Sequence, residues 1–460
     1  MRSVGTTTLE SIVTLGWLAA IMGVVSITTA AVPEQPNVIL IQANDLAGTM
    51  VGFAGHPHVK TPHLDKLAAE SAYFSRCYTP TAEDGPSQGS LLTGQYPHGH
   101  GITTDAGAFK RFVPSFPAAF KMAGYTCGLV GAWNLPCTSP GRPGHGLEDF
   151  TTIDDPQWQW LDGPVWADGE RIEARGYLSD WQGEQAMAFV ERFHDRPFLL
   201  WVSFRAPHEP FEYPPGDEEL YPLDTIQLPD DPPIENLPKQ LHNALAVTQF
   251  QARQGELGRL RSAYYAQITR MDENIGQLLQ RLDELALSDR TIVVFVSNGG
   301  FCLGEHQLFG KGPFFVDTLV RVPLLIRCPI RTPNGSRIER VVSTVDIAPT
   351  LCAMANLEAP INMHGRSLLP LVENVPTARY ADEAFLVNQK LDQSDYPARG
   401  VVGVGYKFID YLRDDDLLFD LLRDPGERRN VFKEPQYRGI VDVLKRRLTL
   451  WRKHTGDPAK

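Results

Sequence analysis

Short, uninterrupted runs of apolar residues recur along this chain, and each run is followed by polar or glycine-rich residues. The four clearest runs lie at residues 37–42, 126–130, 198–204 and 291–296. Runs of this length without polar alternation are typical of strands that are buried on both faces. Segments with helical spacing separate the runs, and the longest covers residues 264–285. The alternation predicts an α/β fold with a mainly parallel central sheet flanked by helices.

Polar side chains directly follow these predicted strands. In an open parallel sheet, ligands bind beyond the carboxyl ends of the strands, where the loops meet. The loops that follow the four runs contain, in order, Asn44-Asp45, Gly131-Ala-Trp-Asn134, Arg205-Ala-Pro-His208 and Ser297-Asn298-Gly-Gly300. We therefore expect one shared pocket at this edge of the sheet.

Residues 81–94 have the pattern of a turn followed by a helix. Asp84 and Gly85 favour the turn, and Pro86 suits the first position of a helix because it has no backbone N–H to leave unpaired. The first turn of a helix presents free N–H groups and the positive end of the helix dipole. This stretch is therefore predicted to face an anion.

The same stretch resembles the sulfatase signature, which is Cys-x-Pro-Ser-Arg followed by a Leu-Leu-Thr-Gly helix. Here Asp84-Gly-Pro-Ser-Gln88 precedes Leu91-Leu-Thr-Gly94. Further motifs that are similar to that family occur in one order along the chain: Lys60-Thr-Pro-His-Leu-Asp65, Gln95-Tyr-Pro-His-Gly-His-Gly101, His145-Gly146, Ala206-Pro-His-Glu-Pro210, Leu303-Gly-Glu-His306, Gly310-Lys311, Arg321-Val-Pro323, Val345-Asp-Ile-Ala-Pro-Thr350 and Leu418-Phe-Asp-Leu-Leu-Arg-Asp-Pro-Gly-Glu427. The resemblance implies an alkaline-phosphatase-like fold.

The resemblance also implies a chemistry from which this chain departs. Active sulfatases oxidise the signature cysteine to formylglycine, whose hydrate attacks the sulfate ester, and they hold one divalent cation, usually calcium. Asp84 stands in place of that cysteine and Gln88 in place of the arginine, so no formylglycine is expected. An ionised Asp84 about 4 Å from a sulfate would repel it by about 4 kcal/mol at an intermediate dielectric. We therefore expect ordinary sulfatase turnover to be impaired.

The cation ligands of the family are only partly retained. Its two ligand pairs fall on Asn44 and Asp45 and on Asn298 and Gly299. Together with Asp84, the side chains of Asn44, Asp45 and Asn298 offer four oxygen ligands, which predicts at most a weak calcium site because only two are carboxylates. The alternative is that these residues only end strands through Asx turns.

Two residues match the histidine and the lysine that contact sulfate in the family. They are His208 and Lys311, which we interpret as substrate-binding residues. The alternative is that each is a surface residue or a hydrogen-bond donor within its own loop.

Three classes of function follow from these residues. The favoured one is a pseudosulfatase that binds a sulfated or phosphorylated small molecule or glycan. The alternative is a divergent, metal-dependent hydrolase of sulfate or phosphate esters that uses Asp84 as ligand or general base. The third is a structural role through the outer surface, for which no protein partner can be named. A formal net charge of −12 argues against nucleic acid as a partner.

The chain divides into three predicted parts. Residues 1–31 are expected to be a signal peptide, with an apolar run at 12–27 and cleavage after Ala30 or Ala31. They predict export to the periplasm or the extracellular space, with no membrane span after cleavage; the alternative is an uncleaved anchor. Residues 36–374 are predicted to form the sulfatase-like domain. Residues 375–460 are predicted to form a smaller α+β subdomain.

Overall fold

The computed structural model describes residues 35–458 except for 112, 154, 330, 333–334, 376–379, 389–396 and 413–414. The predicted signal peptide at 1–31 lies outside the described residues and stays a prediction. Within the described ranges, no helix has the length and apolar character needed to cross a bilayer.

The central sheet contains eleven strands among the described residues, in the order β11-β2-β12-β8-β1-β7-β3-β4-β5-β6, with β13 paired to β2. The strands are β1 (Asn37–Ala43), β2 (Ala72–Tyr78), β3 (Thr126–Gly131), β4 (Asp149–Thr152), β5 (Pro164–Ala167), β6 (Glu170–Glu173), β7 (Phe198–Ser203), β8 (Thr291–Ser297), β11 (Arg321–Val322), β12 (Leu324–Arg327) and β13 (Ser336–Ser343). Neighbours from β8 through β1, β7 and β3 to β4 are parallel. Antiparallel pairs at both sides make the whole sheet mixed. The predicted α/β class is confirmed, and the parallel strands form its centre.

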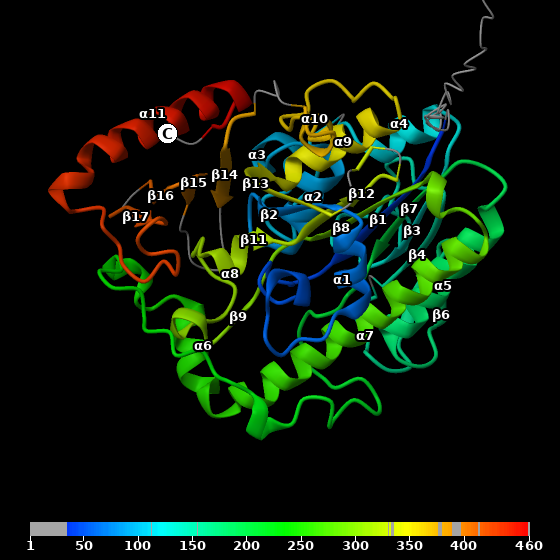
Figure 1. The fold of residues 1–460 in the computed structure, drawn as a ribbon, viewed down its shortest axis with the longest axis horizontal. Coiled ribbons are helices and arrows are strands. Elements are labelled where there is room, and N and C mark those ends of the chain that lie inside the picture. The colour runs from blue at the N-terminus through cyan, green and yellow to red at the C-terminus, as the bar shows by residue number, and fades with distance from the viewer. Residues whose placement is uncertain are drawn as a thin grey trace, which may run out of the picture. The chain divides into compact units, whose positions relative to one another are not determined.

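Helices cover both faces of this sheet (Figure 1). Successive side chains of a strand point to opposite faces. Accordingly, Ile39 and Ile41 of β1 pack in a cluster with α1, α5 and α7, while Val38 and Leu40 pack in a second cluster with α2, α4 and α9. These helices are α1 (Pro62–Ala69), α2 (Asp84–Thr93), α4 (Phe116–Met122), α5 (Leu178–Phe193), α7 (Leu257–Glu284) and α9 (Ile347–Met354). The core therefore consists of two apolar layers with the sheet between them.

Some boundaries differ from the sequence prediction. Helix α1 ends at Ala69, and Ala72 opens β2, a strand that pairs with β12 and β13 and that was not among the predicted runs. The long helix α7 begins at Leu257 rather than at residue 264, because Leu257 is itself buried in the core. Helix α2 begins at Asp84, two residues before the expected Pro86.

A second, four-stranded antiparallel sheet lies in the segment that was predicted as a C-terminal subdomain. Its strands are β14 (Glu383–Asn388), β15 (Ala398–Gly403), β16 (Tyr406–Asp410) and β17 (Leu417–Asp420). One face packs against the final helix, α11 (Arg438–Thr455), through Phe385, Phe408 and Trp451. The other face packs against Phe315 and Leu319 of the main part of the chain. The described residues from 35 to 458 accordingly fall within one compact unit.

Short elements complete the connections between these layers. They are α3 (Pro97–His100), α6 (Leu245–Arg253), α8 (Asp317–Val320), α10 (Leu369–Val372), β9 (Cys302–Leu303) and β10 (Phe309–Gly310). The β9–β10 hairpin matters most for function, because Lys311 follows its second strand directly.

Candidate functional site

Four parallel strands end close together and carry the candidate side chains at their carboxyl ends. Asn44 and Asp45 follow β1, Asn134 follows β3, and Asn298 follows β8, while the loop after β7 carries the residues from Arg205 to His208. Asp84 joins them from the first position of α2. The sheet topology therefore assembles the shared pocket that was predicted at this edge.

A lysine links the two carboxylates of the site. The Lys311 Nζ atom lies 2.5 Å from Asp45 Oδ1 and 2.5 Å from Asp84 Oδ1. All three side chains are largely buried, with exposed side-chain fractions of 19% for Lys311, 0% for Asp45 and 11% for Asp84. One ammonium group therefore compensates two negative charges that have little contact with water.

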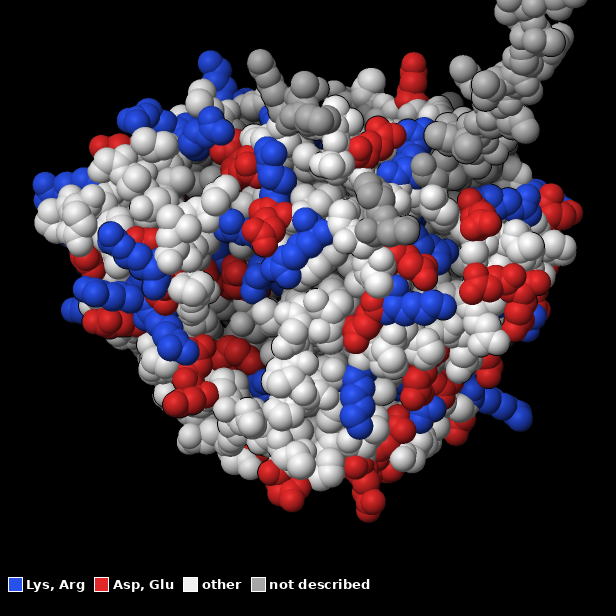
Figure 2. All heavy atoms as spheres, in the orientation of Figure 1, with Lys and Arg blue, Asp and Glu red and all other residues white. Residues whose placement is uncertain are grey.

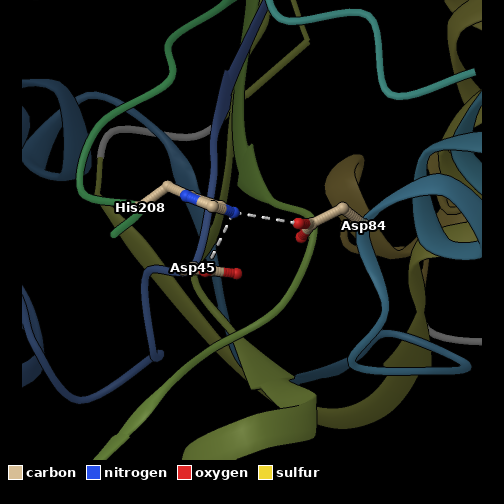
Figure 3. Close-up of side chains that lie close together, drawn as sticks. All are labelled: Asp45, Asp84 and His208. Atoms are coloured by element: carbon tan, nitrogen blue, oxygen red, sulfur yellow. Dashed lines mark ion pairs between the residues drawn. The ribbon is translucent and has the colours of Figure 1, made fainter. Parts of the chain in front are cut away.

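His208 approaches the same two carboxylates from the β7 loop (Figure 3). Its Nε2 atom lies 3.3 Å from Asp84 Oδ2 and 3.9 Å from Asp45 Oδ2. The Nδ1 atom is hydrogen-bonded to the carbonyl oxygen of Glu209. Because that carbonyl can only accept, Nδ1 is the donor of this hydrogen bond, which orients the ring with Nε2 toward the two carboxylates.

The side-chain amides of Asn44 and Asn298 are engaged with their neighbours. Asn298 Nδ2 donates to Asp84 Oδ1 at 3.0 Å and to Asn44 Oδ1 at 2.6 Å, while Asn298 Oδ1 accepts from the Asp45 backbone N–H at 3.1 Å. Asn44 Oδ1 accepts a second hydrogen bond, from Asn134 Nδ2 at 2.9 Å. The two amide oxygens therefore already serve groups of the protein.

Burial and these contacts shift the acidity of the charged groups in different directions. Although burial opposes its charge, the Lys311 ammonium and the His208 ring hold the pKa of Asp84 well below its ordinary value. Burial and the nearby Asp84 charge raise the pKa of Asp45 to about 6. Despite its own burial, Lys311 has a raised pKa because both carboxylates favour its charged form. Asp84 is therefore a stable anion and a weak base.

An arginine extends the site outward. Arg205 NH1 donates to Asn134 Oδ1 at 3.1 Å, and Arg205 NH2 lies 3.4 Å from His208 Nε2. Its guanidinium group lies 4.7 Å from the ring centre of Trp158, within the range of a cation–π contact. These contacts orient the guanidinium group, which makes it suited to recognise an anion.

A cavity of about 560 Å³ opens beside these groups. Its polar lining includes Asp84, Asp105, Asn134, Arg205 and His208, and Trp133 and Leu135 contribute apolar surface. The Asp105 carboxylate accepts the Gly85 backbone N–H at 2.8 Å, at the start of α2. The volume lies within the range of small-ligand pockets, roughly 300–1,000 Å³.

The residues present do not fit a calcium ion of the kind that the family implies. Calcium takes about six to eight oxygen ligands. The atoms of Asp45, Asp84 and His208 do lie within 4.8 Å of one another. However, the amide oxygens of Asn44 and Asn298 accept hydrogen bonds, and the Lys311 ammonium contacts both carboxylates. Besides, glycine at position 299 supplies no side chain.

The structure brings together all six site residues that the sequence suggested. Their places are at the ends of β1 and β8, at the start of α2, and in the loops after β7 and β10: Asn44, Asp45, Asp84, His208, Asn298 and Lys311. Sequence reasoning missed Asp105 and left Arg205 and Asn134 without a role. Arg205 and Asn134 could have been found because both follow predicted strands, but no pattern marked Asp105.

Models of two protein families match the chain. The one described as Sulfatase matches residues 36–357, and the one described as N-sulphoglucosamine sulphohydrolase, C-terminal, matches residues 304–454. The C-terminal match thus begins well before the predicted boundary at residue 375.

Individual relatives point to the same family. The chain is 30% identical over 454 residues to an ulvan-active sulfatase of Formosa agariphila, covering 93% of this chain and 83% of that protein. It is 27% identical to an N-acetylglucosamine-6-O-sulfatase of Bacteroides thetaiotaomicron, covering 88% and 84%. Among solved structures, it is similar to a protein in complex with its substrate D-glucosamine-2-N,6-O-disulfate, with a TM-score of 0.83, 25% identity and coverage of 92% and 99%. The strand-end site, the matched family models and these relatives together establish that the chain belongs to the sulfatase family.

Proposed function

We propose that this sulfatase-family protein binds a sulfated sugar or glycan without hydrolysing its ester. The observation that carries the proposal is the state of Asp84, whose carboxylate is bound by Lys311, Asn298 and His208. A carboxylate cannot become an aldehyde hydrate, so the nucleophile of the family is missing. In another covalent enzyme, loss of the nucleophile lowered kcat by roughly 10⁶-fold.

The contacts of Asp84 also argue against a divergent hydrolase in which Asp84 acts as the general base. A general base works best when its pKa lies near the working pH. The pKa of Asp84 is held well below its ordinary value by Lys311 and His208 in spite of burial. Asp84 would therefore take a proton from water only with difficulty.

The position of the anion-binding groups suggests where a ligand would bind. Lys311 and His208 match the residues that contact sulfate in the family, but here both contact the Asp84 carboxylate. The Asp84 carboxylate thus occupies the two side chains, Lys311 and His208, to which an ester sulfate would otherwise bind. We infer that a ligand sulfate is instead recognised by Arg205, at the cavity beside them.

The relatives support sulfated sugars as the ligand class. One is named for N-acetylglucosamine-6-O-sulfate and another for ulvan, and one solved structure contains D-glucosamine-2-N,6-O-disulfate. Basic side chains on the face shown in Figure 2 gather over α11, which carries Arg438, Lys445, Arg446, Arg447, Arg452 and Lys453. Over most of that face, acidic and basic side chains are interspersed, so a polyanion would need local contacts.

Titration calorimetry and a hydrolysis assay on the purified protein test this proposal. D-glucosamine-2-N,6-O-disulfate should bind saturably and be recovered intact. Arg205→Met should weaken binding about tenfold or more, because a hydrogen bond to a charged group contributes roughly 1.5–3 kcal/mol. Arg253→Met is the matched control, since the exposed Arg253 lies over Phe309 and does not line the cavity.

The same samples distinguish the alternative function. Chromogenic sulfate and phosphate esters should release no product above the level of an Asp84→Ala variant. Turnover by the parent protein that disappears in Asp84→Ala would identify a divergent hydrolase and refute the pseudosulfatase proposal. Absence of any binding by the folded protein would refute the ligand assignment.

A further inference from the structure

The negative charges of Asp45 and Asp84 are compensated by a side chain of the protein itself. Two carboxylates that are almost excluded from water need a compensating positive charge. Lys311 Nζ lies 2.5 Å from an oxygen of each carboxylate. No other lysine or arginine among the described residues is paired with either carboxylate in an ion pair.

We propose that the Lys311 ammonium takes the place of a divalent cation as the permanent counter-ion of Asp45 and Asp84, so that this site does not bind calcium. A calcium ion between the carboxylates would have to displace Lys311 or lie next to it, and like charges at such distances repel strongly. The amide oxygens that could add ligands already accept hydrogen bonds from Asn298, Asn134 and the Asp45 backbone.

The local structure supports a fixed position for this lysine. Lys311 directly follows Gly310, which has a φ of +87° at the end of the β9–β10 hairpin. The hairpin is held by pairing of Phe309 with Leu303, and both side chains are buried. The ammonium thus belongs to a side chain that directly follows a paired hairpin, and unlike a free ion it cannot be removed by a chelator.

The inference does not depend on which ligand the protein binds, and it is tested without any sugar. The thermal unfolding midpoint and calorimetric binding of calcium are measured in CaCl₂ and in EDTA. The wild-type protein should show no calcium binding and the same midpoint in both solutions. A calcium-dependent rise of the wild-type midpoint would overturn the proposal.

Variants at position 311 provide the positive test. Lys311→Ala removes the ammonium and leaves two uncompensated carboxylates, so this variant should unfold at a lower temperature in EDTA and regain stability in millimolar calcium. Lys311→Gln keeps hydrogen-bond donors while removing the charge, so it serves if the alanine variant does not fold. The double variant Lys311→Ala with Asp84→Asn has only one carboxylate and should lose the calcium response.

The results separate this inference from the proposed function. Folded Lys311 variants that calcium neither binds nor stabilises would show that the ammonium does not stand in for a cation, whatever the protein does with sulfated sugars. Conversely, failure of sugar binding would leave the calcium results of wild type and Lys311 variants unaffected.

Discussion

Asn298 donates a side-chain hydrogen bond to Asp84 Oδ1 at 3.0 Å, which ties the end of β8 to the first residue of α2. Both residues are buried, and they are 214 positions apart in the chain. The bond places a neutral donor beside the carboxylate, at a position that matches one of the family's cation ligands. The Asn298 amide therefore contributes to stability by satisfying Asp84.

The first prediction tests that contact. Asn298→Asp should lower the free energy of unfolding by about 3 kcal/mol, because it removes a donor and places a like charge beside Asp84. Urea unfolding at neutral pH measures the effect. Asn236→Asp makes the same change at an exposed position and should alter stability little. Equal stability of the two variants would contradict the role given to Asn298.

The second prediction concerns the attachment of the C-terminal sheet. Lys407 of β16 is fully buried, with Nζ 2.7 Å from Asp317 Oδ1 and 2.5 Å from Glu427 Oε1. Lys407→Met should destabilise the protein by roughly 3–5 kcal/mol, because it leaves the buried Glu427 carboxylate without its cation and leaves Asp317 with Arg321 alone. Lys433→Met breaks an exposed pair with Asp415 and should cost at most about 1 kcal/mol. Urea denaturation of both variants provides the comparison.

The third prediction concerns acid stability. The buried ring of His100 accepts the Ile102 N–H at Nδ1, and its Nε2 lies 3.1 Å from Ser90 Oγ. Burial lowers the pKa of His100 to about 3. Below pH 6.5 the His100 imidazole therefore binds a proton in the unfolded chain but stays neutral in the folded protein. Stability should be complete above pH 6.5 and fall toward pH 4, by up to about 1.4 kcal/mol per pH unit for this group.

Replacing this histidine should change that pH dependence. His100→Gln should be less stable at pH 7, and its stability should fall less steeply between pH 6.5 and 4. Burial also lowers the pKa values of His98 and His364 to about 4, so part of the slope should remain. Urea midpoints at several pH values measure it; parallel curves for the two proteins would show that His100 does not contribute.

The fourth prediction concerns the strand end that positions Asn134. Gly131 closes β3 with a φ of +115°, and a Cβ atom there would lie 2.0 Å from the carbonyl oxygen of Ser203. Gly131→Ala should therefore cost about 3 kcal/mol from backbone strain and overpacking. Gly439→Ala in α11 meets nothing within 4 Å and should instead stabilise the helix by about 0.5 kcal/mol. The thermal unfolding midpoint should fall in Gly131→Ala and rise slightly in Gly439→Ala.

The strands at the centre of the sheet were predictable because burial on both faces requires an apolar residue at nearly every strand position. β1, β7 and β8 pack against helices on both faces, so every position is apolar or nearly so. Strand β2 was not predicted, because the polar residues Ser75 and Arg76 interrupt its apolar pattern. Arg76 is only partly buried and donates hydrogen bonds to the carbonyl oxygens of Gly403 and Val404 in the second sheet. A strand whose polar residues are satisfied by distant segments carries no such local signal.

The sequence by itself determined which chemical groups stand at each strand end: the carboxylates of Asp45 and Asp84, the amide of Asn298, and the absence of the family's cysteine. Only the tertiary structure decided which atoms meet. Lys311 and Asp84 are 227 residues apart, and their contact depends on where the β9–β10 hairpin packs relative to α2. The electrostatic energy of such groups depends on distance and burial, and neither is recorded in the local order of residues.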